Sequence, residues 1–221
     1  MKTSNVVSKV LSIALVAGFM VVGQNATAQE TKMEKKEMAN KMDKKDKMSM
    51  KTNSTMQANA KPVVVGGAKM FPTRNIVENA VNSKDHTTLV TAVKSADLVE
   101  TLSSEGPFTV FAPTNKAFDV LPAGTVETLL KPENKKSLQT VLTYHVVEGK
   151  WNAEDILILI EKGNGKAEIK TISGGMITAW VKGEDVYISD QKGNSAKVTI
   201  ADVNQSNGVI HVVDTVLLPK S

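Results

Sequence analysis

The sequence predicts an α+β fold, with helices in the first half of the folded region and a sheet in the second. Between residues 76 and 142, apolar residues recur three and four positions apart, the spacing of amphipathic helices. From residue 166 onward, short segments of alternating apolar and polar residues are separated by glycine-containing turns, which is typical of strands. Because the two patterns occupy separate parts of the chain, we expect α+β packing and not a parallel α/β sheet.

Residues 1–28 have the pattern of an export signal. Lys2 and Lys9 lie in the charged region, residues 10–22 form an apolar run, and Ala26-Thr-Ala28 is a small-residue cleavage site. The run is shorter than the roughly 20 residues that span a bilayer, so an uncleaved anchor is the less favoured alternative. We expect cleavage after Ala28, no membrane span, and a secreted or periplasmic protein.

Residues 29–61 differ in composition from the rest of the chain. They hold nine Lys against five Asp and Glu, six Met, and almost no branched or aromatic side chains. Such a segment cannot offset the entropy of ordering, so we expect a disordered tether. An alternative is a Cu(I) site of Met38, Met42, Met48 and Met50, because soft thioethers suit that ion. The favoured interpretation is a cationic spacer that attracts anionic polymers or envelope surfaces.

The folded region is mildly acidic, although the whole chain carries +4. Residues 62–221 hold sixteen Lys and Arg against eighteen Asp and Glu. A nucleic-acid-binding domain is expected to carry a basic face with aromatic residues, and the sequence shows none, so we predict no nucleic-acid partner. The chain has no cysteine, which excludes disulfides and thiolate metal sites. Stability must therefore come from packing.

The helical half begins after Pro72. We expect helices around 76–81, 89–93 and 98–102, a strand over 108–112, and helices around 114–118, 126–130 and 132–142. Ser83 or Asp85 is the candidate cap of the second helix, and Thr114 of the fourth.

The second half opens with Asn152 and Asp155, which predict a capping box before the apolar run 156–161; that run fits either a helix or a buried strand. Five strands are expected, over 167–172, 176–181, 185–190, 197–203 and 209–218. Asn207-Gly208 predicts the turn into the last strand, because this dipeptide tolerates positive φ.

Three blocks in fixed order carry a resemblance to a known family. They are Thr109-Val-Phe-Ala-Pro-Thr-Asn-Lys-Ala-Phe-Asp-Val-Leu-Pro122, Tyr144-His-Val-Val-Glu-Gly149 and Asn207-Gly-Val-Ile-His-Val-Val-Asp-Thr-Val-Leu-Leu-Pro219. Together they resemble the fasciclin-type domain of secreted and cell-surface proteins, over residues 72–219. The resemblance implies a wedge of two β-sheets with helices along one edge, and non-enzymatic binding to a cell-surface or matrix protein or polysaccharide. It also implies that the strand at 109–112 pairs with the final strand.

The resemblance suggests four binding residues. Tyr144 and His145 match a tyrosine-histidine pair linked to adhesion in animal fasciclin domains. Asp202 and Val203 stand where the family has an Asp-Ile pair. From the residues alone, buried packing is the favoured role of Tyr144 and His145, since apolar side chains surround them, and Asp202 is also an ordinary turn former.

The sequence holds no motif for catalysis. It has no Gly-x-Ser-x-Gly elbow, zinc-protease helix or phosphate-binding loop, and we predict neither an enzyme nor a cofactor. His211 and Asp214, three residues apart on a strand, face opposite sides and cannot pair. We expect His86 on the surface near a helix start, without a metal-ligand neighbour. Trp151, Trp180 and Tyr187 suggest a small-molecule or sugar-stacking site as an alternative, although so few aromatic residues favour a core role.

Overall fold

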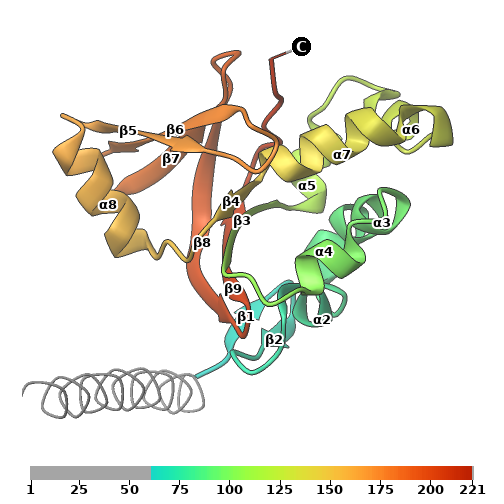
Figure 1. The fold of residues 1–221 in the computed structure, drawn as a ribbon, viewed down its shortest axis with the longest axis horizontal. Coiled ribbons are helices and arrows are strands. Elements are labelled where there is room, and N and C mark those ends of the chain that lie inside the picture. Colours follow the sequence, from blue (N-terminus) through green and yellow to red (C-terminus); the bar gives the residue numbers. More distant parts are fainter. Residues whose placement is uncertain (1–60, 221) are drawn as a thin grey trace, which may run out of the picture. The chain divides into compact units, whose positions relative to one another are not determined.

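The computed structural model describes residues 61–220 (Figure 1). Several predictions lie outside these residues and stay predictions: the signal peptide and its cleavage after Ala28, the tether up to residue 60, and the thioethers of Met38, Met42, Met48 and Met50. Within the described residues, no helix is both long and apolar enough to cross a bilayer.

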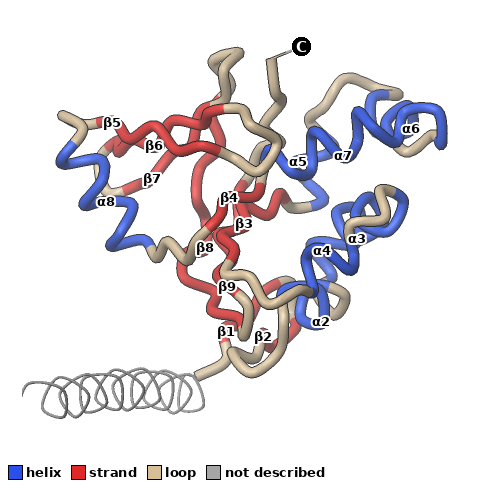
Figure 2. Tube along the Cα trace, viewed as in Figure 1, coloured by secondary structure: helices blue, strands red, loops and turns tan. Residues whose placement is uncertain are grey.

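Helices dominate the first half of the described region, as the sequence predicts (Figure 2). They are α2 (Ile76–Ala80), the 3-10 turn η1 (Lys84–His86), α3 (Thr87–Ser95), α4 (Val99–Ser103), α5 (Asn115–Asp119), α6 (Thr125–Leu129), the 3-10 turn η2 (Pro132–Asn134) and α7 (Lys135–Tyr144). One further helix, α8 (Ala153–Lys162), opens the second half. Helix α8 resolves the alternative at residues 156–161 in favour of a helix. At its start the Asn152 N–H donates to Asp155 Oδ2 at 2.9 Å, one half of the expected capping box.

The strands are β1 (Val63–Val65), β2 (Ala68–Met70), β3 (Phe108–Pro113), β4 (Val146–Glu148), β5 (Lys166–Lys170), β6 (Met176–Lys182), β7 (Asp185–Ser189), β8 (Ser195–Gln205) and β9 (Gly208–Val213). Seven of them follow the order β4-β3-β9-β8-β7-β6-β5. Strand β8 joins two halves: its start pairs with β7, and the rest pairs with β9 through register shifts around Ile200. Such irregularities bend a strand, which gives the expected wedge and confirms the α+β class.

Strands β3 and β9 bring the first and last sequence blocks together. They pair in parallel from Phe108 opposite Gly208 to Pro113 opposite Val213, which confirms the expected long-range pairing. Gly208 does not adopt a positive φ, contrary to the reason inferred from the sequence. Glycine is required at position 208 for steric reasons, because a Cβ there would lie 2.0 Å from the carbonyl oxygen of Phe108.

Asn207 ties this turn to the helices. The Ile76 N–H donates to its Oδ1 at 3.0 Å. Its Nδ2 donates to the carbonyls of Leu102 at 2.9 Å and Ser104 at 2.8 Å. A buried amide with three bonds to α2 and the end of α4 fixes the helices against the sheet.

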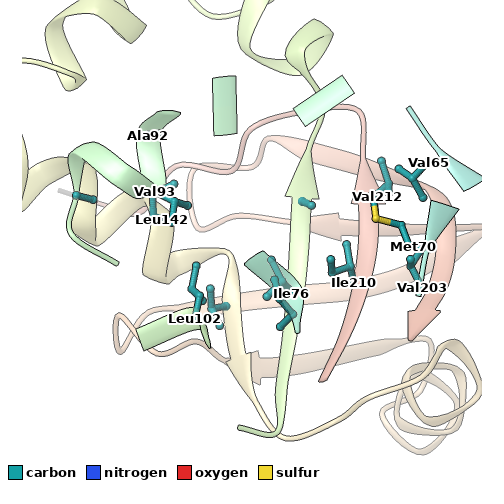
Figure 3. Close-up of a cluster of buried hydrophobic side chains, with 14 of the residues drawn as sticks. Val65, Met70, Ile76, Ala92, Val93, Leu102, Leu142, Val203, Ile210 and Val212 are labelled. Carbon is teal, nitrogen blue, oxygen red and sulfur yellow. The ribbon is translucent and has the colours of Figure 1, made fainter. Parts of the chain in front are cut away.

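Strands β3, β4 and β9 separate two hydrophobic cores. The helix-side core lies between these strands and the helices, and ten of its residues are labelled in Figure 3: Val65, Met70, Ile76, Ala92, Val93, Leu102, Leu142, Val203, Ile210 and Val212. The wedge core lies between the two halves of the sheet and under α8; it contains Phe111, Tyr144, Val147, Ile156, Ile160, Ala167, Ile169, Ile177, Ala179, Ile188, Ala196, Val213 and Leu217. Alternation explains the division, since Val110 and Ala112 of β3 face one core and Phe111 the other.

The hairpin of β1 and β2 has no counterpart among the sequence-based predictions. Its strands pair from Val63 opposite Met70 to Val65 opposite Ala68. Val65 and Met70 are buried in the helix-side core. The hairpin therefore covers one end of this core, next to η1.

Candidate functional site

Tyr144, at the end of α7, is buried with no exposed surface. Its hydroxyl donates to the Met176 carbonyl at 2.7 Å and accepts from the Gln191 N–H at 3.2 Å. Burial is the main cause that raises the pKa of this phenol. Tyr144 thus links α7 to the second half of the sheet, and its ring is not available to a partner.

His145 is 3% exposed. Its Nε2 accepts from the Leu217 N–H at 3.0 Å, so Nδ1 carries the proton and donates to the Val141 carbonyl at 2.8 Å. Burial lowers the pKa of His145 to about 4 against the opposing effects of the Val141 carbonyl and Asp190. The structure gives this pair the packing role that the residues alone favour, and leaves no side-chain surface for direct contact.

Asp202 and Val203 also serve the fold. Asp202 lies at the irregularity of β8 with φ 57°, and its Oδ1 accepts from the Ala153 N–H at 2.7 Å, at the start of α8. A carboxylate is stabilising at this end of a helix. Val203 is 1% exposed. Of the four residues suggested by the resemblance, only Asp202 retains partial exposure.

The other two histidines, His211 and His86, are buried as well. His211 is buried; it accepts from the Asp202 N–H at Nδ1 and donates to the Trp151 carbonyl at 2.8 Å, away from Asp214, as expected. His86 was expected on the surface, and this is wrong: it is 3% exposed. The reason is the β1–β2 hairpin, because Ser83 Oγ donates to the Val65 carbonyl and bonds His86 Nδ1 at 2.9 Å.

The aromatic residues separate into two environments. Trp151 donates from Nε1 to the Glu148 carbonyl at 2.9 Å and lines an open groove of about 690 Å³ between β4, β5 and the segment up to Gly174. Trp180 and Tyr187 lie directly opposite each other on β6 and β7, with ring centroids 4.8 Å apart and an interplanar angle of 20°. Both are partly exposed, so the expectation of a core role is wrong for them.

We call the surface around this aromatic pair the outer face: the side of β5–β8 that points away from the wedge core. Alternation along the strands assigns to it Lys166, Glu168, Lys170, Met176, Thr178, Trp180, Lys182, Asp185, Tyr187, Ser189, Ser195 and Lys197. The intervening residues Ile177, Ala179, Ile188 and Ala196 are completely buried. One row across the outer face reads Lys166, Trp180, Tyr187 and Lys197.

Hydrogen bonds hold the outer face in place. Trp180 Nε1 donates to Ser189 Oγ at 2.7 Å, and Ser189 Oγ bonds Ser195 Oγ at 2.8 Å. Beside Tyr187, Lys197 Nζ lies 2.7 Å from Asp185 Oδ2. This bond with Asp185 raises the pKa of Lys197. The outer face carries four lysines against two carboxylates, whereas residues 62–221 as a whole have more acidic than basic groups.

Within residues 61–220, no group of three His, Asp or Glu side chains is arranged to hold a metal ion. The outer face is not among the sequence-based predictions, although the sequence holds a signal for it. With Gly183 and Glu184 as a two-residue hairpin turn, Lys182 pairs with Asp185 and Trp180 must face Tyr187.

The chain is similar to a known protein family and to several individual proteins. The family model of the Fasciclin domain matches residues 84–219. Protein sll1483 of Synechocystis sp. is 50% identical over 164 residues, covering 74% of this chain and 84% of that protein. Transforming growth factor-beta-induced protein ig-h3 of Sus scrofa is 39% identical over 132 residues, 59% of this chain and 17% of that protein.

Among solved structures, the domain pair of the insect cell adhesion molecule Fasciclin I has a similar fold. The TM-score is 0.58 at 16% identity, covering 66% of this chain and 51% of that chain, so the likeness spans about half of the domain pair. Given the family match and the relative that is 50% identical, the chain belongs to the fasciclin-domain family.

Proposed function

We propose that this protein is an exported, non-enzymatic adhesion module that binds an acidic polysaccharide of a cell surface or matrix through its outer face. The observation that carries the proposal is the partly exposed Trp180–Tyr187 stack, placed between Lys166 and Lys197 on one row of the sheet. The export-signal pattern of residues 1–28 and the kinship with a cell adhesion molecule support a role outside the cytoplasm.

The stack is suited to contact because its geometry is fixed before a partner arrives. Trp and Tyr combine a large apolar surface with few rotatable bonds, so they lose little entropy on binding. The bond from Trp180 to Ser189 and the opposing Tyr187 ring restrict the indole further. Sugar rings present flat C–H surfaces that stack on such side chains, and the neighbouring hydroxyls of Ser189 and Ser195 supply polar contacts.

Charge favours an acidic polymer. The outer face has an excess of lysines on a domain whose other residues carry an acidic excess, so an anionic polymer is attracted to this face in particular. The Lys-rich residues 29–61 would add to this attraction, as the sequence predicts. Nucleic acid is the less favoured anionic partner. It is usually bound by longer basic tracts, whereas the outer face offers only the Trp180 and Tyr187 rings and also carries the carboxylates of Glu168 and Asp185.

Catalysis is not part of the proposal. The chain has three histidines, and in the structure all three are buried, so none is available as an exposed general base. The Cu(I) alternative concerns Met38, Met42, Met48 and Met50 and stays a prediction outside the described residues.

The test is affinity electrophoresis of the mature chain in gels that contain alginate (which is a polyuronate), neutral dextran or single-stranded DNA. We expect retardation by alginate alone, and its loss in the double variant Trp180→Ala/Tyr187→Ala. The matched control is Trp151→Phe, which changes the aromatic residue of the groove and leaves the outer face intact. Loss of retardation in Trp151→Phe only would place binding in the groove, and equal retardation by single-stranded DNA would reduce the effect to charge; either outcome contradicts the proposal.

A further inference from the structure

The two outermost strands of the sheet, β4 and β5, border the same open groove. At one end the chain closes the gap between them, because the Ile172 N–H donates to the Val146 carbonyl at 2.8 Å. Along β4 and β5 themselves the sheet stays open, since each strand pairs with a single neighbour in the described part of the chain. The groove there measures about 690 Å³, which lies within the usual range of about 300–1,000 Å³ for binding pockets.

The backbone of β5 turns hydrogen-bonding groups toward the groove. The Thr171 N–H donates to the Gly175 carbonyl at 2.9 Å, and the same register continues along β5 and β6. In an antiparallel pair, bonded positions alternate with positions whose N–H and C=O point away from the partner strand. The N–H and C=O groups of Glu168 and Lys170 therefore point away from β6, into the groove that both residues line. The bond from Ile172 to β4 has the same direction, which agrees with this alternation.

The same alternation applies to β4. The His145 carbonyl accepts from the Phe111 N–H of β3, and the Gly149 N–H donates to the carbonyl that precedes β3, each at 2.9 Å. The positions bonded to β3 are therefore 145, 147 and 149, and the Glu148 N–H points away from β3, toward the groove. Edge groups of this kind are a template for a further strand.

The floor of the groove is apolar. Val147 and Ile169 are buried in the wedge core, and Trp151 and Leu159 pack against that core while remaining partly exposed. All four side chains line the groove. Since side chains of a strand alternate between its two faces, every second side chain of an added strand would point toward this floor.

We propose that the groove binds an extended peptide segment of a partner protein, which adds a strand to the edge of β5. The backbone of the segment exchanges hydrogen bonds with Glu168 and Lys170, and its inward side chains cover Trp151 and Leu159. In this mode of binding, main-chain bonds supply affinity and alternate side chains supply specificity. Because β4 and α8 border the groove on its other side, a single strand is favoured over the edge of another sheet.

Charge defines the outward side chains of the segment. Glu168 and Lys170 are exposed. Opposite charges attract when they lie on directly opposed residues of neighbouring strands. The segment should therefore carry a basic residue opposite Glu168 and an acidic residue opposite Lys170, with an apolar residue between them.

The probe is the capped peptide Val-Glu-Val-Lys-Val, and its matched control carries N-methyl groups on the Glu and Lys nitrogens. The control keeps every side chain but lacks the two N–H groups that donate to β5. We expect saturable binding of the probe to the mature chain in calorimetric titration. The control should bind at least about tenfold more weakly, because two hydrogen bonds are lost. Replacing the Glu of the probe by Lys should weaken binding about twofold to fivefold, through repulsion at Lys170.

Amide NMR locates the bound peptide. The Glu168 and Lys170 amide signals should move downfield with the probe, whereas those of Ala167 and Ile169, which are bonded to β6, should move less. In the free protein, hydrogen exchange should be faster at positions 168 and 170 than at 167 and 169. Protection of 168 and 170 that rises with protein concentration would assign the edge to a second copy of the chain. Protection at every concentration would mean that the edge is covered, and either outcome overturns the proposal.

Two variants at one position complete the test. Lys170→Pro removes one outward N–H and preserves the pairing with β6, because an edge strand tolerates proline where its N–H points outward. It should bind the probe about fivefold more weakly than Lys170→Ala, which loses the same charge and keeps the N–H. Trp180→Ala/Tyr187→Ala should bind the probe like the wild type, which separates this site from the aromatic pair.

If Lys170→Pro does not fold, the N-methylated control and the wild-type amide signals decide. Equal affinities of the probe and its N-methylated control, or of Lys170→Pro and Lys170→Ala for the probe, would overturn the proposal.

Discussion

The two faces of strands β5–β8 have opposite roles although they alternate residue by residue. The inner face is completely buried at Ile177, Ala179, Ile188 and Ala196. The outer face presents Trp180 beside Tyr187, held by side-chain bonds and flanked by lysines. The same strands therefore supply both the core and the proposed contact surface, so substitutions one residue apart should separate stability from binding.

The largest expected effect is on the inner face. Ile188→Ala should lower the free energy of unfolding by about 3 kcal/mol, because it removes buried methylene groups and leaves a cavity. Ser195→Ala, on the exposed outer face of the neighbouring strand, is the matched control, with an effect of about 0.5 kcal/mol or less. Urea unfolding followed by circular dichroism measures both. Similar losses in the two variants would break the distinction between the faces.

The next effect is that of acid pH, which should lower the free energy of unfolding by protonating the three buried histidines. Burial lowers the pKa of His145 to about 4 and also lowers those of His86 and His211. The unfolded chain, with histidine pKa values near 6.5, binds protons first, so stability is fully present above about pH 6.5 and falls as the pH approaches 4. His145 alone contributes about 3 kcal/mol to this loss.

Urea unfolding at pH 7.5, 6.5, 5.5 and 4.5 measures the acid effect. The stability should decrease at each step below pH 6.5. A constant free energy of unfolding between pH 7.5 and 5 would contradict the buried, neutral state of the three histidines.

A smaller loss of stability is expected when a tyrosine hydroxyl is removed, and it should be larger for the buried Tyr144 than for the partly exposed Tyr187. Tyr144→Phe removes a hydroxyl that donates to the Met176 carbonyl and accepts from the Gln191 N–H, and should cost about 1 to 2 kcal/mol. Tyr187→Phe makes the same chemical change on the outer face and should cost less than about 0.5 kcal/mol. Thermal unfolding of the two variants side by side gives the difference, and an equal cost would contradict the assigned role of Tyr144.

The sequence predicted the architecture where local patterns were strong. The helices from Ile76 to Tyr144 follow apolar spacing, and the strands from residue 166 follow alternation, so both were found. The β1–β2 hairpin was missed because three-residue strands show too little periodicity to recognise. His86 was predicted on the surface because no local pattern shows that Ser83, bonded to the hairpin at Val65, also bonds the His86 ring inside the domain.

The candidate site was harder to predict than the fold. Tyr144 and His145 were suggested as binding residues because they match a motif. In the structure their side chains instead form hydrogen bonds to distant parts of the domain, at Met176 and Leu217. Trp180 and Tyr187 lie in no motif, and their significance depends on cross-strand register, which a count of aromatic residues ignores. The buried position of His86 depends on its bond with Ser83, which is itself bonded to Val65, and no local pattern shows these long-range contacts.

Affinity and stability measured together in Trp180→Ala and Ile188→Val test directly whether the outer face is the contact surface. The dissociation constant for an alginate oligomer and the free energy of unfolding are measured for each variant and the wild type. We predict that Trp180→Ala weakens binding at least tenfold with about 1 kcal/mol or less of lost stability. Ile188→Val should lose about 1 kcal/mol of stability and keep its affinity. Unchanged binding in Trp180→Ala, or losses of affinity that follow stability in both variants, would contradict the assignment of the outer face as the contact surface.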